Sequence, residues 1–181
     1  SGIILELNCE TDFCAKGDKF QGLVNDVAKA LMDSKASTLE EALQVAMPEG
    51  TTEEYIKAMC SSIGENMALR KFARLTVDGS GAVVSYIHMG GKIGVLVNLK
   101  VEGDIDATAV GKDVAMQIAA LNPRFWDKSQ VSQDVLDEEK KIMMVQMEND
   151  PKMASKPEQV REKIVMGKMN KFYEENCLLQ M

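Results

Sequence analysis

The spacing of apolar residues changes its period along this chain, and that change restricts the fold more than any other feature. Up to about residue 63 most apolar residues recur at helical spacing, whereas residues 69–101 read as strands separated by glycine-rich turns. From residue 132 to residue 173 the helical pattern returns in two segments of similar length. This order of patterns predicts an α+β fold.

The first third of the chain is predicted to form one short strand and three amphipathic helices. Ser37–Glu41 has the form of a capping box, and Gly64 follows the last apolar stripe, where a left-handed C-cap glycine belongs. The expected bounds are residues 3–7 for the strand, about 16–33 for the first helix, 37 to before Pro48 for the second, and 50–63 for the third.

The middle of the chain is predicted to be an antiparallel meander with one covered face, formed by residues 69–77, 82–88 and 92–101. The turn cluster Asp78–Gly81 is the clearest seam, and it divides a first subdomain, residues 1–81, from a second, residues 82–181. A helix is expected from Ala107 to Leu121, because the following Asn122-Pro123 pair disfavours helical geometry.

Two helices, about Ser132–Asn149 and Glu158–Tyr173, are joined by a short loop marked by prolines. Helices of similar length with such a short connection should lie antiparallel, so residues 132–173 are predicted to form a helical, coiled-coil-like hairpin. Its outer faces carry mixed charges. The hairpin is either a lid on the core or a protruding arm for a partner.

Composition favours a soluble protein that contacts other proteins. The 181 residues include 45% hydrophobic side chains, which is enough for a core, and the formal net charge is −7. A dedicated nucleic-acid binder usually has a basic surface, so direct nucleic-acid binding is not expected. No apolar run reaches the roughly 18 residues of a membrane helix, and no signal or transit segment opens the sequence.

No convincing active site is found, and the chain is expected not to be an enzyme. Its one histidine, His88, lacks an obvious nucleophile, and the paired carboxylates stand at helix starts, where the helix dipole explains them. Gly90-Gly91-Lys92 lacks the full phosphate-loop frame. The four cysteines match no zinc spacing and are expected to be reduced thiols, so no metal or cofactor is predicted. A cysteine-dependent enzyme would need a thiol close to His88.

The stretch from Asn8 to Lys16 joins the first strand to the first helix and carries one large apolar side chain, Phe13, on a polar corner. Asn8, Thr11 and Asp12 favour a turn there. The residues alone leave two interpretations of Phe13 open. It either folds back into the core, as most apolar residues do, or stands out as an apolar wedge for a partner protein.

Five ordered motifs resemble the elongation factor Ts family, the guanine-nucleotide exchange factors of elongation factor Tu. They are Leu7-Asn8-Cys9-Glu10-Thr11-Asp12-Phe13, Ile63-Gly64-Glu65-Asn66-Met67, Ser85-Tyr86-Ile87-His88 with Gly91-Lys92-Ile93-Gly94-Val95-Leu96-Val97, Met116-Gln117-Ile118-Ala119-Ala120-Leu121-Asn122-Pro123, and Lys163-Ile164-Val165-Met166-Gly167-Lys168-Met169-Asn170-Lys171-Phe172.

The resemblance implies a two-part α+β core with small antiparallel sheets packed by helices, plus the helical hairpin. It also implies that Phe13, beside Asp12, enters an apolar pocket of the nucleotide-binding domain of elongation factor Tu and disturbs its magnesium site. We therefore expect Phe13 to be exposed on a corner held rigid by Thr11 and Asp12.

Further contacts implied by the resemblance are made by Ile63-Gly64 and by His88. In this sequence Met89 separates His88 from the glycines that follow it in the family pattern. The implied activity is promotion of GDP release from elongation factor Tu, with no cofactor, no direct nucleic-acid contact and no membrane contact.

The small helical module that usually opens the family and its C-terminal module have no counterpart here, so the chain is expected to be a core region. A bacterial cytoplasmic origin is expected, and an organellar one stays open. The alternative function is a scaffold or dimerisation module that uses the hairpin, for example to form a homodimer, with exchange activity lost through truncation.

Overall fold

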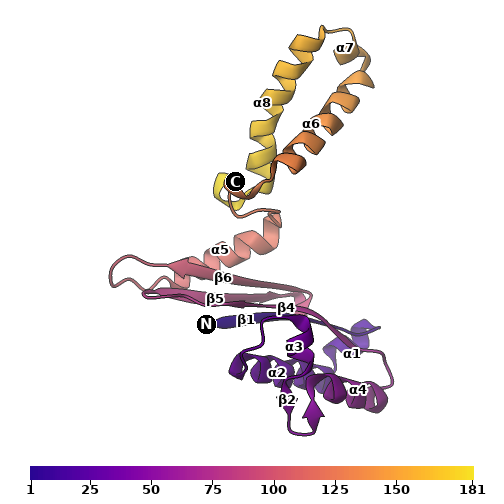
Figure 1. Cartoon of the computed structure of the whole chain (residues 1–181), viewed down its shortest axis with the longest axis vertical. Helices are drawn as coiled ribbons and strands as arrows, with labels where there is room; N and C mark the ends of the chain where they lie inside the picture. The colour runs from indigo at the N-terminus through magenta and orange to yellow at the C-terminus, as the bar shows by residue number, and fades with distance from the viewer. The chain divides into compact units, whose positions relative to one another are not determined.

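Antiparallel strand pairs organise the first part of the chain in the computed structural model, which describes residues 1–181. Strand β1 (Gly2–Asn8) pairs with β4 (Ala68–Leu75), and β5 (Gly81–His88) pairs with β6 (Ile93–Lys100). A two-residue pair joins β2 (Ala46–Met47) to β3 (Gly50–Thr51). The predicted α+β fold, with small antiparallel sheets packed against helices, is confirmed (Figure 1).

The predicted meander over residues 69–101 is wrong in one respect, because β4 pairs with β1 and not with β5. Apolar side chains of the β1–β4 pair, such as Leu5 and Leu69, pack in the core formed with the preceding helices. Those of the β5–β6 pair, such as Val95, pack against α5 (Thr108–Leu121). Each pair therefore covers a different helical layer, which the pattern of a single strand does not reveal.

One apolar core joins β1 and β4 to the helices that lie between them in the sequence. These helices are α1 (Asp12–Lys16), α2 (Asp18–Asp33), α3 (Leu39–Leu43) and α4 (Thr52–Ile63). Phe20, Leu23 and Val27 of α2 are buried in this core. Capping boxes begin α3 at Thr38, as predicted, and α4 at Thr51.

Two helix bounds differ from the prediction. The first long helix begins at Asp18, because residues 12–16 form a separate helix and Gly17 between them has extended backbone geometry. The second predicted helix ends at Leu43, because residues 46–51 turn back as the β2–β3 pair. The predicted left-handed cap at Gly64 is confirmed by its φ of 86°.

Internal contacts divide the chain into two compact units, residues 1–119 and 120–181. The predicted seam at residues 78–81 therefore lies inside the first unit. The reason is that β1 packs against the β5–β6 pair: a Cβ atom added to Gly2 would lie 2.7 Å from Cγ1 of Val83. The strands on either side of the seam belong to one packed body.

The second unit contains the predicted antiparallel helical hairpin (Figure 1). Its helices are α6 (Gln133–Glu148), α7 (Pro151–Ala154) and α8 (Glu158–Asn176), flanked by the short 3-10 turns Lys128–Gln130 and Leu178–Gln180. Val131, Met169, Phe172 and Cys177 form a small buried core, against which Phe125 packs while Trp126 stays exposed. No helix in the structure has the length and apolar composition needed to cross a bilayer.

Candidate partner-binding surface

The corner after β1 is a one-turn-and-a-half helix, α1, and it presents Phe13 to solvent. The Thr11 hydroxyl accepts a hydrogen bond from the backbone N–H of Cys14 at 3.1 Å, which caps the helix. Cys14 faces the core, whereas Phe13, one position earlier, points the other way and is 91% exposed. The expectation that Phe13 is exposed, and not a core residue, is confirmed.

Glu65 holds this corner from the opposite segment, just after α4. One of its carboxylate oxygens accepts hydrogen bonds from the backbone N–H groups of Glu10 and Thr11, at 3.1 and 3.0 Å. The other accepts a bond of 2.6 Å from the Thr11 hydroxyl. The Thr11 hydroxyl bond is the main reason that the pKa of Glu65 is lowered. The ionised carboxylate therefore fixes the backbone immediately before Phe13.

Asp12 ties the same corner to the turn between β5 and β6. Its carboxylate lies 3.0 Å from Nζ of Lys92, and the hydrogen bond from this ammonium lowers the pKa of Asp12. As the first residue of α1, Asp12 also places its negative charge at the end of the helix where the backbone dipole favours it. Asp12, which was predicted to help hold the corner rigid, thus forms an ion pair with Lys92.

Ile63 and Gly64 form the turn that delivers Glu65 to the corner. The Gly64 N–H donates to the carbonyl of Cys60 at 2.8 Å, and the left-handed geometry of Gly64 ends α4. Ile63 is partly buried against the core, and Gly64 is exposed with no atom within 4 Å of the position that a Cβ would occupy. The open space at Gly64 allows another chain to approach the backbone closely.

His88 stands at the end of β5, exposed, beside a tight 3-10 turn formed by Met89–Gly91. The Tyr86 hydroxyl lies 2.9 Å from Nδ1 of His88, and the two rings stack with their centroids 5.8 Å apart. Met89 has a φ of 52°, which is uncommon for a residue with a side chain. Met89 is exposed on this turn, and Ile87 is exposed near the end of β5.

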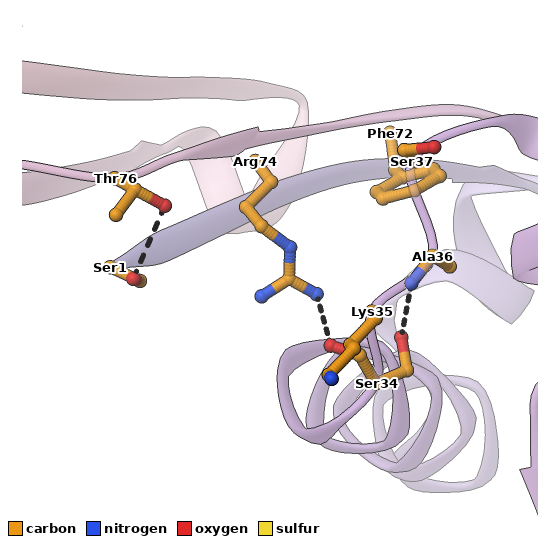
Figure 2. A pocket seen from close by; sticks show the side chains of 8 residues that line it. All are labelled: Ser1, Ser34, Lys35, Ala36, Ser37, Phe72, Arg74 and Thr76. Carbon is orange, nitrogen blue, oxygen red and sulfur yellow. Dashed lines mark hydrogen bonds between the residues drawn. The ribbon is translucent and has the colours of Figure 1, made fainter.

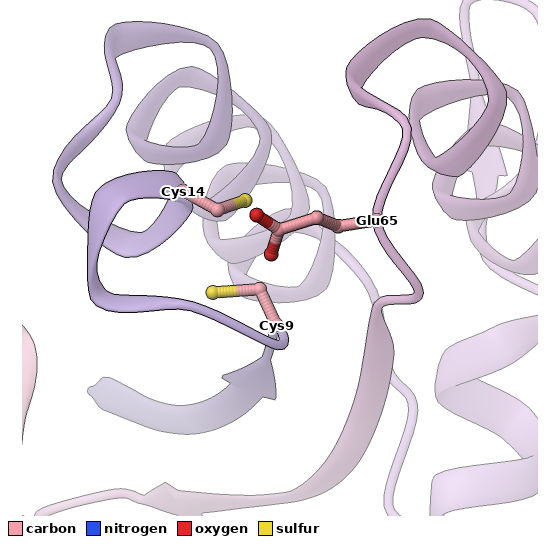
Figure 3. A group of neighbouring side chains, drawn as sticks. All are labelled: Cys9, Cys14 and Glu65. Atoms are coloured by element: carbon pink, nitrogen blue, oxygen red, sulfur yellow. The ribbon is translucent and has the colours of Figure 1, made fainter.

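Three side chains of the kinds that bind metal ions lie close together beside α1 (Figure 3). The sulfur atoms of Cys9 and Cys14 and a carboxylate oxygen of Glu65 all lie within 4.8 Å of one another. Burial, followed by the hydrogen bond with Cys9 and the charge of Glu65, raises the pKa of Cys14 to about 12. Both cysteines are free thiols, as the sequence predicted.

A shallow pocket of about 530 Å³ lies elsewhere in the first unit, between the ends of β1 and β4 and the end of α2 (Figure 2). Its one guanidinium, that of Arg74, donates to the backbone carbonyl oxygens of Leu31, Met32 and Ser34. These carbonyls lie at the C-terminal end of α2, where a positive charge is favoured. Arg74 therefore has a structural role as a helix cap.

Comparison with known proteins bears directly on this surface. A family model described as Elongation factor TS matches residues 10–181. That match covers nearly the whole chain, including the corner, the turn at Gly64 and the β5–β6 hairpin. The chain belongs to the elongation factor Ts family.

Individual members of the elongation factor Ts family show the same likeness. An elongation factor Ts from Clostridium botulinum is 45% identical over 99% of this chain. Those from Halothermothrix orenii and Clostridium kluyveri are 43% and 44% identical over 98% of it. The chain spans 58% of the length of each of these relatives.

Within this member of the elongation factor Ts family, the structure links most of the predicted site residues through a few contacts. Thr11 is bonded to Glu65, which follows Ile63 and Gly64 directly, while Asp12 is bonded to Lys92 on the β5–β6 turn. These contacts leave out His88, whose partner is Tyr86. The roles of these predicted site residues in binding a partner protein remain predictions.

Sequence reasoning gave no role to Glu65 or Lys92, although both stand inside the quoted motifs. Glu65 lies 54 residues from Thr11, and Lys92 lies 80 residues from Asp12. The only available signals were that Glu65 follows Gly64 directly and that Lys92 belongs to the same motif as His88. The contact itself depends on the tertiary fold.

Proposed function

We propose that this chain is the core of an elongation factor Ts, which binds elongation factor Tu and promotes the release of GDP. The observation that carries the proposal is the 91% exposure of Phe13 on a backbone fixed by Thr11 and Glu65. An apolar ring of this size in water favours burial in a partner. The family membership supplies the partner class.

The rigid corner supports a wedge mechanism. A flexible phenylalanine would lose conformational entropy on insertion, whereas one on a capped and hydrogen-bonded backbone loses little. Elongation factor Tu holds GDP through phosphate contacts and a magnesium ion that bridges to the phosphate oxygens. By linkage, a protein that binds best when this magnesium is displaced weakens nucleotide binding by the same factor.

The other predicted contacts extend the surface around Phe13. Gly64 offers an exposed backbone with no side chain in the way, and His88 stands beside the exposed apolar side chains of Ile87 and Met89. A partner that covers Phe13 and one of these regions buries more apolar surface than the ring alone offers. We infer that the regions at Gly64 and around His88 contribute binding energy in addition to that of Phe13.

We infer that the chain performs no covalent chemistry of its own in this exchange. It acts by binding, without a bound cofactor and without direct contact with nucleic acid, and it works in the bacterial cytoplasm. The net charge of −7 is in keeping with a protein partner and not with a polyanion.

The test is a stopped-flow measurement of fluorescent GDP leaving elongation factor Tu. The rate should rise with the concentration of this chain and then saturate, and added magnesium should oppose the effect. The chain should also form a complex with elongation factor Tu that GDP dissociates. A release rate that does not depend on the chain, with no complex in gel filtration, would refute the proposal.

A scaffold or dimerisation function is the second candidate, favoured by one observation. The hairpin exposes apolar side chains that a second copy could cover: Ile142, Val145, Val160 and Met166. Sedimentation of the chain by itself distinguishes the two candidates. A stable dimer without any acceleration of GDP release would favour the scaffold.

A further inference from the structure

The cluster formed by Cys9, Cys14 and Glu65 has the composition of a metal site. Two thiols and a carboxylate are all established ligands of zinc. The two cysteines come from the corner around α1, and Glu65 comes from the segment after α4, so a shared ion would join two separate segments. Figure 3 shows the Glu65 carboxylate directed at the space between the two sulfur atoms.

We propose that Cys9, Cys14 and Glu65 bind a thiophilic divalent cation, Zn²⁺ or its analogue Cd²⁺. Each cysteine would lose its thiol proton and bind through Sγ, Glu65 would bind through one carboxylate oxygen, and water would complete a tetrahedral set. Binding therefore releases two protons, and neither oxidation nor reduction is involved.

The distances suit this set after a small adjustment. Zinc lies about 2.3 Å from sulfur and about 2.0–2.2 Å from a carboxylate oxygen, so the ligand atoms of a tetrahedral site are separated by roughly 3.5 Å. The three ligand atoms already lie within 4.8 Å of one another. Side-chain rotation at Cys9, which is only half-buried, can close the remaining gap without moving the backbone.

The ligand atoms are also free enough to bind. The Cys9 thiol donates a long hydrogen bond of 3.4 Å to the Thr11 carbonyl, and its other close polar neighbour is the Cys14 thiol of the same cluster. The Glu65 oxygen that accepts from the Thr11 hydroxyl has one such hydrogen bond and keeps a second lone pair. By contrast, the sulfur of Cys60 accepts from the N–H of Met67 at 3.2 Å and has no comparable ligand neighbours.

A bound ion would act on the corner that presents Phe13. Cys14 follows Phe13 directly in α1, and Glu65 already holds the backbone of Thr11. The ion would cross-link these segments and stabilise the folded first unit by an amount that rises with the logarithm of its free concentration above the dissociation constant. This inference concerns metal binding, and its test does not depend on the exchange activity.

The experiment titrates the reduced chain with Cd²⁺ and follows the ultraviolet charge-transfer absorption from thiolate to cadmium, while native mass spectrometry counts Zn²⁺ ions and released protons. We expect one ion per chain and a higher unfolding temperature with Zn²⁺. Cys9→Ser and Cys14→Ser should each weaken binding by more than the roughly 10- to 100-fold effect of losing an outer-shell partner. Cys60→Ser is the matched control and should bind as the parent chain does.

The result can contradict the proposal in several ways. Unchanged binding by Cys9→Ser and Cys14→Ser, or equal loss in Cys60→Ser, would place the metal elsewhere. A Cys9–Cys14 disulfide that forms under air while the reduced chain takes up no metal would assign the pair to thiol oxidation and overturn the metal site. Because Cys14 is buried, the metal-free unfolding temperature of each variant establishes that it is folded.

Discussion

Replacing Phe13 with alanine should slow GDP release from elongation factor Tu while leaving the stability of this chain unchanged. The ring is 91% exposed and makes no core contact, so its removal opens no cavity. Exposed substitutions of this kind usually change the free energy of unfolding by less than about 0.5 kcal/mol. The free energy of unfolding of the chain should therefore stay nearly the same in Phe13→Ala.

The magnitude of the exchange defect follows from the area that the ring buries in the partner. Full burial of a phenylalanine side chain is worth roughly 1.5–3 kcal/mol, and each 1.4 kcal/mol corresponds to about a factor of ten. If Phe13 contributes this energy only when the nucleotide site is disturbed, Phe13→Ala should lower the rate of GDP release by roughly 10- to 100-fold. Phe13→Leu should retain part of the activity.

The assay is stopped-flow release of fluorescent GDP at subsaturating concentrations of each variant. Ile105→Ala is a matched control, because Ile105 is also a large apolar residue in the first unit and is 67% exposed. Thermal unfolding of each variant reports its stability. Exchange by Phe13→Ala at the parental rate, or a rate that falls equally in Ile105→Ala, would refute the wedge argument.

Three further predictions concern the supports of this corner and the stability of the fold. Glu65→Gln should slow exchange although Phe13 remains, because only one of the two terminal atoms of an amide can accept, so the Thr11 N–H and the Thr11 hydroxyl can no longer both be satisfied as they are now; full activity in the release assay would contradict this. Gly64→Ala should lower the free energy of unfolding by about 1–2 kcal/mol in a urea titration, because its φ is 86° although the surrounding space is open. Hydrogen bonds from Ser37 and then Thr38 lower the pKa of Glu41 in the folded chain. Their contribution to stability is therefore present above the ordinary glutamate pKa and is lost as the pH falls through the lowered pKa. Glu41→Gln should make the stability depend less on pH in this range of an acid-unfolding curve.

Local signals predicted the parts of this fold that local physics determines. The capping box at Thr38, the left-handed cap at Gly64 and the hairpin of residues 132–173 each depend on residues within a few positions of one another. The pairing of β1 with β4 joins residues that are 60 to 73 positions apart, and the apolar pattern of a strand does not show which strand it pairs with. This is why the predicted meander assigned β4 to its neighbour in sequence.

The features of the candidate surface likewise divide into those that could be predicted from the sequence and those that could not. The exposure of Phe13 was expected from the family resemblance, since its apolar character alone favoured the core. The contacts of Glu65 and Lys92 with the corner could not be predicted, because each depends on a carboxylate or ammonium brought from a distant segment. For the same reason the sequence did not indicate that Glu65 lies close to Cys9 and Cys14.

These distant contacts determine whether Phe13 can act as a wedge. Helix α1 has five residues, and a helix of that length is not stable by itself in water. A peptide of residues 8–17 has the same Thr11, Asp12 and Phe13 but lacks both Glu65 and Lys92, so its ring would sample many orientations. The rigid presentation of Phe13 is thus a property of the folded first unit, in which β1, α4 and the β5–β6 turn meet at one corner.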